Sequence, residues 1–185
     1  LHQLMVILER AKWSRAFYLG KNWFSRFFKK YNLNLQEETL KLDLKGLESF
    51  CEDVSLNLKL GDIICLFGEL GSGKTTAVRN LINSFYKRNK LQKPISIKSP
   101  SFPILLTYEV NNFEIYHYDL YRISKRSELS EINILEELNN SITFIEWPEI
   151  IIDDLKKDFN FYSIDLAIIN EHTRKIKHNL IFNWY

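Results

Sequence analysis

The residues best suited to chemistry lie between 68 and 75, where the segment GELGSGKT fits the pattern G-x-x-x-x-G-K-[ST]. A polyphosphate needs converging backbone N–H groups, a helix N-terminus, a lysine for its terminal phosphates and a hydroxyl for Mg²⁺. We expect Lys74 to bridge the β and γ phosphates and Thr75 to bind Mg²⁺. The other loop residues expected to contact a nucleotide are Glu69, Leu70, Gly71, Ser72, Gly73 and Thr76.

The sequence on either side of this segment decides between a phosphate-binding loop and a chance glycine turn. Residues 62–67, DIICLF, form a continuous apolar run that is typical of a strand buried on both faces of a parallel sheet. Residues 74–88 have the pattern of a helix, and a loop between such a strand and helix favours phosphate binding. The chain has neither an [NT]KxD guanine motif nor an LSGGQ transporter motif. We therefore expect an adenine nucleotide and disfavour a transport ATPase.

A second candidate is Glu146, which follows the apolar segment ITFI at 142–145. An acidic residue at the carboxyl end of a buried strand, close to a phosphate loop, has the position of a Walker B carboxylate that binds Mg²⁺. The common alternative is a solvated charge at a strand end. Glu146 alone leaves both interpretations open.

These side chains must be positioned by strands and helices that alternate along the chain. Residues 105–110 and 113–120 flank Asn111 and Asn112, a pair suited to the positive φ angles of a tight hairpin turn. The other expected elements are strands at 39–44 and 142–147, helices at 46–58 and 127–140, and a terminal hairpin of residues 162–169 and 174–182. We therefore predict an α/β domain, P-loop NTPase-like and three-layered, whose central sheet mixes parallel and antiparallel strands.

Length and composition limit the remaining possibilities. A chain of 185 residues with 45% apolar residues predicts one globular domain, which we place at 36–185, preceded by an extension at 1–35. Cys51 and Cys65 have neither metal-ligand nor redox spacing, which favours a reducing compartment. No window reaches the roughly 18 apolar residues of a membrane-spanning helix. We therefore expect a cytoplasmic protein without a transmembrane segment.

The extension at 1–35 differs in charge from the rest of the chain. The net charge of +2 divides into +6 over residues 1–30 and −4 over residues 31–185. Its aromatic residues recur near helical spacing, as in a basic amphipathic helix. Such a helix would contact an anionic membrane surface, tRNA or a partner, or would address an organelle. The alternatives are a helix packed on its own domain, or residues that belong only to an upstream start.

Four segments together resemble one family. They are GDIICLFGELGSGKTT at 61–76, SPSF at 99–102, HYDLYR at 117–122 and IEWPE at 145–149. In this order and spacing they are similar to the bacterial TsaE (YjeE) ATPases of threonylcarbamoyl modification of tRNA adenosine. The resemblance extends over 36–185 and departs at Ser101, where the family usually has threonine.

The resemblance implies roles for residues outside the phosphate loop. Ser101 would sense phosphate or Mg²⁺ in a switch loop, and Asp119 would hold Mg²⁺ through water or orient the attacking water. Glu146 would associate with Mg²⁺, so that the catalytic set is Lys74, Asp119 and Glu146, and the metal set is Thr75, Glu146 and Asp119. Trp147 would pack against nucleotide or partner, with a buried core tryptophan as the alternative. His117 lies on the same face of its strand as Asp119, and we interpret it as a packed neighbour.

The predicted function is ATP binding and slow, Mg²⁺-dependent ATP hydrolysis within the tRNA-modifying assembly. The resemblance implies TsaD-like and TsaB-like partners, with tRNA contacted indirectly through the complex, and a role in resetting or regulating that machinery. One alternative is a small P-loop kinase for a nucleoside or metabolite, with Arg122, Lys125 and Arg126 as lid cations. The other is a non-catalytic nucleotide-binding module.

Overall fold

The computed structural model describes residues 38–180, so the predicted extension at 1–35 and the start of the domain at 36 lie outside the described residues. The strands are β1 (Glu38–Leu42), β2 (Ile63–Phe67), β3 (Leu105–Val110), β4 (Phe113–Asp119), β5 (Ser141–Glu146), β6 (Phe161–Ile168) and β7 (Arg174–His178). The helices are α3 (Leu44–Asn57), α4 (Lys74–Arg88), α5 (Arg126–Glu131), α6 (Ile134–Glu137) and α7 (Ile152–Asp158), with 3₁₀ turns η2 (Leu138–Asn140) and η3 (Pro148–Ile150).

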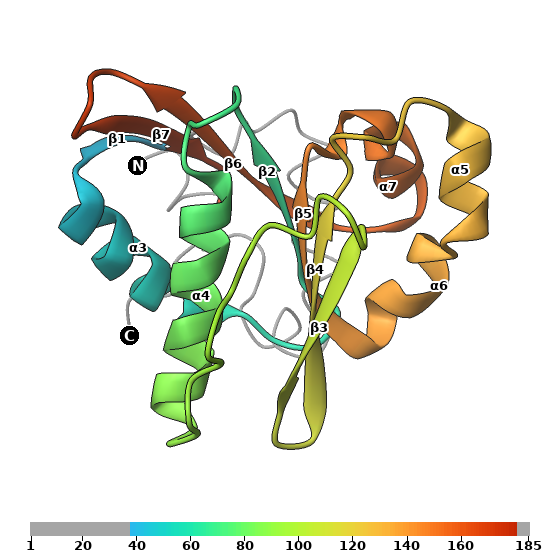
Figure 1. Cartoon of the computed structure of the whole chain (residues 1–185), viewed down its shortest axis with the longest axis horizontal. Helices are drawn as coiled ribbons and strands as arrows, with labels where there is room; N and C mark the ends of the chain where they lie inside the picture. The colour runs from blue at the N-terminus through green and yellow to red at the C-terminus, as the bar shows by residue number, and fades with distance from the viewer. Residues whose placement is uncertain (1–37, 181–185) are drawn as a thin grey trace, which may run out of the picture. The chain divides into compact units, whose positions relative to one another are not determined.

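The strands form one sheet in the order β1-β7-β6-β2-β5-β4-β3 (Figure 1). Strand β2 is parallel to β5 and β6, and β4 is parallel to β5. The pairs β1 with β7, β6 with β7, and β3 with β4 are antiparallel. The predicted mixed sheet is therefore confirmed, with the parallel strands at its centre and antiparallel pairs at both edges.

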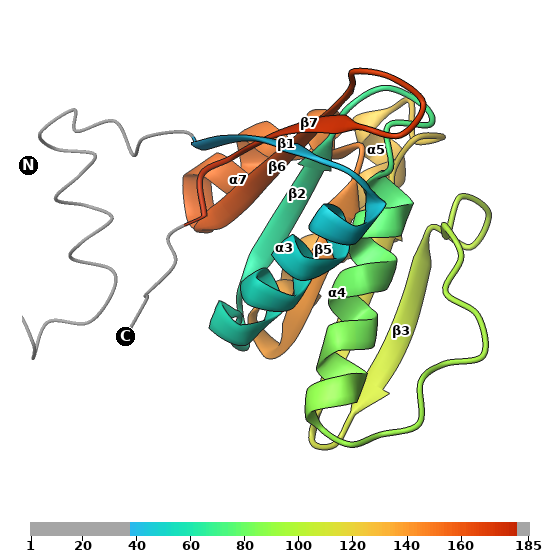
Figure 2. The same ribbon diagram turned by 90° about the vertical axis from the view of Figure 1, so that its left-hand side faces the viewer.

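Helices cover both faces of this sheet. Helices α3 and α4 lie on one face, and α5, α6 and α7 lie on the other (Figures 1 and 2). Side chains of β2 alternate between the two cores, because Ile64 and Leu66 face α3 and α4 while Ile63 and Cys65 face the opposite side. A strand buried on both faces accounts for the continuous apolar run in the sequence. The three-layer architecture is confirmed.

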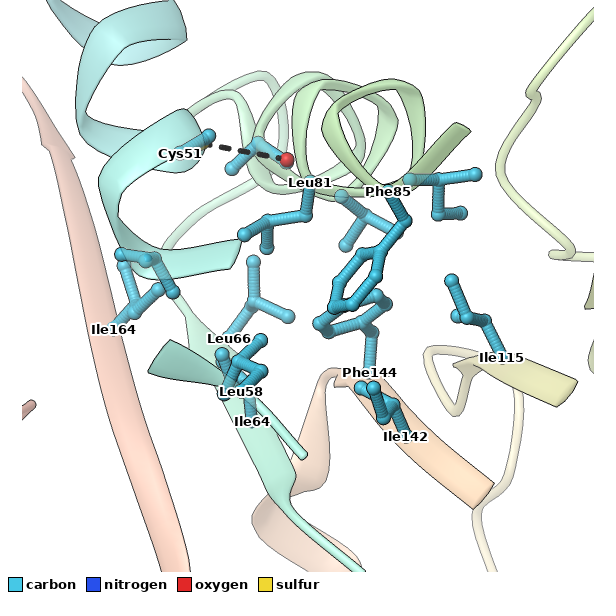
Figure 3. Packing of buried hydrophobic residues seen from close by; sticks show 14 of the residues in the cluster. Cys51, Leu58, Ile64, Leu66, Leu81, Phe85, Ile115, Ile142, Phe144 and Ile164 are labelled. Carbon is cyan, nitrogen blue, oxygen red and sulfur yellow. Dashed lines mark hydrogen bonds between the residues drawn. The ribbon is translucent and has the colours of Figure 1, made fainter. Parts of the chain in front are cut away.

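The core beneath α4 is built from aromatic and branched side chains. Leu81 and Phe85 of α4 point toward the sheet, where they meet Leu66 and Phe144 (Figure 3). All four side chains are fully buried. This packing fixes the axis of α4 over β2 and β5 and thereby fixes the point at which the helix begins.

Two local predictions need correction, and one helix was missed. The helix expected at 127–140 is broken into α5, α6 and η2, because Asn133 adopts a left-handed φ of 48°. Helix α7 was not predicted, although its two acidic residues at the start and two lysines at the end are a helix signature. The strand expected at 142–147 ends at Glu146, since Trp147 also has a left-handed φ.

No helix within residues 38–180 has the length and apolar content that crossing a membrane would require.

Candidate phosphate-binding site

The candidate site lies at the carboxyl ends of the parallel strands. The segment 68–73 joins β2 to α4, Asp119 ends β4 and Glu146 ends β5. Asp119 and Glu146 are register neighbours on adjacent strands, and Glu146 is the register neighbour of Leu66 near the end of β2. The sheet therefore brings the two predicted carboxylates and the predicted phosphate loop together at the carboxyl ends of its parallel strands.

The loop owes its shape to three glycines. Gly68, Gly71 and Gly73 have φ angles of 132°, 78° and 108°, which side chains with a Cβ rarely adopt. Gly73 is the N-cap of α4, so the N–H groups of the first helical turn, including those of Lys74 and Thr75, point toward the loop. This arrangement gives the converging amides and the positive helix end that an anion requires.

The two glycines Gly68 and Gly71 should differ sharply in their tolerance of alanine. A Cβ on Gly68 would lie 2.2 Å from the Leu166 carbonyl oxygen, whereas a Cβ on Gly71 would meet nothing within 4 Å. We expect Gly71→Ala to cost about 1 kcal/mol of unfolding free energy from its positive φ alone. Gly68→Ala should cost clearly more, at least about 2 kcal/mol, because backbone must also shift. Urea denaturation of both variants tests the difference, and equal losses would contradict the close approach of Gly68 to β6.

Lys74 is held over the loop by three contacts. Its Nζ donates to the carbonyl oxygens of Gly68 at 2.6 Å and Glu69 at 3.0 Å, and it lies 3.7 Å from the ring centroid of Trp147. The pKa of Lys74 is lowered, because burial disfavours the ammonium more than Glu146 and the neighbouring carboxylates favour it. A polyphosphate bound here would raise that pKa and stabilise the charged form.

Glu146 connects the loop to the interior of the sheet. Its Oε2 accepts a hydrogen bond of 3.0 Å from the Thr75 hydroxyl, and its Oε1 lies 2.8 Å from Nε2 of His117. Glu146 and His117 are both buried. With the proton on Nε2, the imidazole donates to the carboxylate and fixes its second oxygen toward Thr75. The interpretation of His117 as merely a packed neighbour is therefore wrong.

Asp119 holds the SPSF segment. Its Oδ2 accepts hydrogen bonds from the hydroxyls of Ser99 and, at 2.9 Å, of Ser101, while its Oδ1 accepts the N–H of Tyr121 at 3.0 Å. The two serine hydroxyls are 2.8 Å apart. Ser101, the predicted switch residue, is therefore hydrogen-bonded to Asp119, the predicted catalytic aspartate, so that a movement of one would displace the other.

Trp147 is half-buried and faces the site. Its left-handed φ of 58° turns the chain out of β5, and its N–H donates to the Leu66 carbonyl at 3.3 Å. The ring contacts the Lys74 ammonium and lies 4.8 Å from the ring centroid of Tyr121. A tryptophan buried in the core is therefore excluded. Tyr121 lies beyond the end of β4 and is exposed.

The remaining predicted loop residues occupy different environments. Glu69, Leu70 and Gly71 form the exposed crest of the loop, and Thr76 lies half-buried in the first turn of α4. Ser72 is fully buried, and its carbonyl accepts a hydrogen bond of 2.9 Å from Nε of Arg174. The sequence offered no signal for Arg174, since its contact depends on how the β6–β7 hairpin is placed in space.

The comparisons with known proteins agree with the four motifs. Residues 42–176 match the family described as "Threonylcarbamoyl adenosine biosynthesis protein TsaE". The TsaE protein of Rickettsia typhi is 35% identical over 157 residues, which cover 83% of this chain and 99% of that protein. The TsaE protein of Rickettsia conorii is 42% identical over 121 residues, which cover 65% of this chain and 62% of that protein. Both are named tRNA threonylcarbamoyladenosine biosynthesis proteins.

A solved structure supports the fold independently. The crystal structure of YdiB from Bacillus subtilis superposes with a TM-score of 0.54 and covers 77% of this chain and 86% of that chain. At 21% identity this likeness concerns the fold alone. The family match and the relatives carry the assignment: the chain belongs to the TsaE family of tRNA threonylcarbamoyladenosine biosynthesis proteins.

Proposed function

We propose that this protein binds ATP with Mg²⁺ and hydrolyses it slowly, as a component of the tRNA threonylcarbamoyladenosine machinery that resets or regulates TsaD-like and TsaB-like partners. One observation carries the proposal. At the carboxyl ends of the central strands, the structure brings together Lys74, the N-terminus of α4 and the hydrogen-bonded pair Thr75 and Glu146. Each of these features suits a polyphosphate or its metal ion. Contact with tRNA would be indirect, through the complex.

The residues of the loop fit a nucleoside triphosphate. A Cβ at Gly71 or Gly73 would meet no neighbour closer than 3.9 Å, so no protein atom crowds the loop at these two positions. Lys74 supplies a buried positive charge, and the first turn of α4 supplies amides. The absence of a guanine motif favours ATP over GTP.

The residues present also fit Mg²⁺ bound together with phosphate. Mg²⁺ prefers oxygen ligands and commonly takes one or two carboxylates plus phosphates. Thr75, Glu146 and Asp119 would hold it, because Glu146 and Asp119 end neighbouring strands and the Thr75 hydroxyl, in the first turn of α4, donates to Glu146. Within residues 38–180 no group of three or more His, Cys, Asp or Glu side chains could hold a metal ion by itself, so the proposed site would need phosphate or water oxygens as further ligands. When bound, the metal ion would neutralise charge on the transferred phosphate.

The chain's own residues divide the remaining work. His117 orients Glu146, and Glu146 orients the Thr75 hydroxyl through the hydrogen bond between them. Asp119 accepts hydrogen bonds from two hydroxyls and one N–H, which fix the orientation of its carboxylate. A carboxylate fixed in this way could orient a water molecule. Because Ser99 and Ser101 bind Asp119, a phosphate that draws Ser101 away would also change the position of the switch loop.

The kinase alternative receives less support from the lid cations it requires. Arg126 forms an ion pair with Asp154, and the Arg122 guanidinium stacks 3.9 Å from the ring centroid of Phe102. Two of the three predicted lid cations therefore already have partners on the protein, which weakens the kinase alternative.

The test is ATP hydrolysis by the full chain, measured with and without candidate TsaD-like and TsaB-like proteins. We expect a low rate alone, a higher rate with the partners, and dependence on Mg²⁺. Phosphate appearing on a nucleoside or metabolite would establish the kinase instead. ATP binding without hydrolysis under every combination would establish a non-catalytic module.

A further inference from the structure

The strongest feature that the proposed function leaves unused is Arg174, the first residue of β7. Its Nε donates to the Ser72 carbonyl at 2.9 Å, and its NH1 donates to carbonyl oxygens of the turn before β7. Those oxygens belong to Asn170 at 2.8 Å, Thr173 at 3.2 Å and Glu171 at 3.4 Å. One guanidinium therefore ties the phosphate loop to the β6–β7 hairpin, with its planar fork divided between the two.

The hairpin also fixes the other end of the loop. Gly68 approaches β6 so closely that a Cβ on it would lie 2.2 Å from the Leu166 carbonyl oxygen. Ile168 of β6 is the register neighbour of Arg174, so both contacts come from one end of the same hairpin. Segment 68–72 is thus held at both ends by the hairpin. Its first residue, Gly68, packs closely against the backbone of β6, and its last residue, Ser72, accepts a hydrogen bond from a charged guanidinium.

We propose that Arg174 is a positioning residue for phosphate binding, acting through the Ser72–Gly73 peptide. A trans peptide is planar, so its C=O and N–H point in opposite directions. A Ser72 carbonyl held toward Arg174 therefore turns the N–H of Gly73, the N-cap of α4, away from the guanidinium. Without the guanidinium this peptide loses the contact that fixes its carbonyl, so the Gly73 N–H would be correctly aimed at a bound phosphate for less of the time.

The proposal rests on nucleotide binding as the function of the loop, and it differs from a general effect of charge. Arg174 would also attract a polyphosphate as a nearby cation. Lysine keeps that charge but has a single ammonium in place of a planar fork, so it cannot reproduce both sets of bonds. Arg174→Lys therefore separates orientation from charge, and Arg174→Met removes both. Lys175, the next residue of β7, is exposed and provides the matched control, Lys175→Met.

The first measurement is calorimetric titration of ATP into the four full-length proteins. We expect Arg174→Met and Arg174→Lys each to lose about tenfold in affinity, the low end of the effect of a charge-assisted hydrogen bond. Lys175→Met should bind like wild type. Wild-type affinity in Arg174→Met would show that Arg174 has no role in ATP binding. Wild-type affinity in Arg174→Lys would show that Arg174 acts only through its charge. Either result overturns the proposal.

The second measurement is amide hydrogen exchange over residues 68–73 without nucleotide, compared between wild type and Arg174→Lys. We expect faster exchange in the variant, confined to this loop. Unchanged exchange overturns the proposal even if the methionine variant does not fold. Failure of wild type and Lys175→Met to bind ATP would instead refute the proposed function, and the exchange result would still decide the role of Arg174.

Discussion

Lys74→Ala is expected to weaken ATP binding by about ten- to a hundredfold, the range of one charge-assisted contact. The lysine is 4% exposed, and its ammonium is already aimed across the loop by the Gly68 and Glu69 carbonyls. A polyphosphate therefore meets a cation whose side-chain entropy has largely been lost on folding. The burial that lowers its pKa also strengthens its attraction to phosphate, because opposite charges attract more strongly where water is partly excluded. Calorimetric titration of ATP into the folded variant measures the loss.

The matched control for Lys74 lies at the other end of the same helix. Lys87 is exposed and forms an ion pair with Glu52 at 2.6 Å. Such surface pairs contribute little to stability because solvent screens them, so Lys87→Ala should leave both folding and ATP affinity close to wild type. Thermal unfolding without nucleotide checks that Lys74→Ala is folded. Equal ATP affinity in Lys74→Ala and wild type would remove the phosphate-loop assignment.

Glu146→Gln is expected to reduce ATP hydrolysis about a hundredfold or more, while ATP affinity changes only a few-fold. Glutamine has nearly the same shape, so its carbonyl oxygen can still accept from His117 and its amide can still donate to the Thr75 hydroxyl. What disappears is the negative charge next to the phosphate loop. Hydrolysis needs that charge more than nucleotide binding does. The hydrolysis rate should therefore fall much more than the ATP affinity.

The control for the charge of Glu146 is Glu136, which lies exposed in α6, before the start of β5. Glu136→Gln removes the same charge away from the glycine loop and should hydrolyse ATP like wild type in the complete assembly. The two rates are compared at saturating ATP and with titrated Mg²⁺. Wild-type hydrolysis by Glu146→Gln in that assembly would show that the carboxylate has no catalytic role.

The elements nearest the phosphate loop were predictable because local signals determine them. The apolar run of β2, the glycines after it and the helix pattern from Lys74 to Arg88 appear in the structure as β2, the loop and α4. The Asn111 turn was predictable for the same reason, since its positive φ of 53° suits asparagine. Composition and periodicity therefore predicted that the sheet is mixed and that the candidate site lies at the carboxyl ends of its parallel strands.

Other features depended on contacts between distant residues. The bond between His117 and Glu146 joins two strands whose relative register no local pattern states. The left-handed turn at Trp147 places its ring beneath Lys74, although propensity disfavours such a φ for an aromatic residue. Arg174 could be linked to Ser72 only after the hairpin was placed. Sequence thus identified the chemical groups but not the side chains that orient them.

The separation of the partners along the chain has a consequence for synthesis. Thr75 and Glu146 are 71 residues apart, and Ser72 and Arg174 are 102 residues apart. A nascent chain emerges from its N-terminus, so the glycine loop leaves the ribosome long before β5 and the β6–β7 hairpin do. Closing such long intervals costs chain entropy that only the finished sheet recovers. A partly made protein therefore carries the glycine loop without the contacts from Glu146 and Arg174, and these contacts can all form only once translation has passed β7.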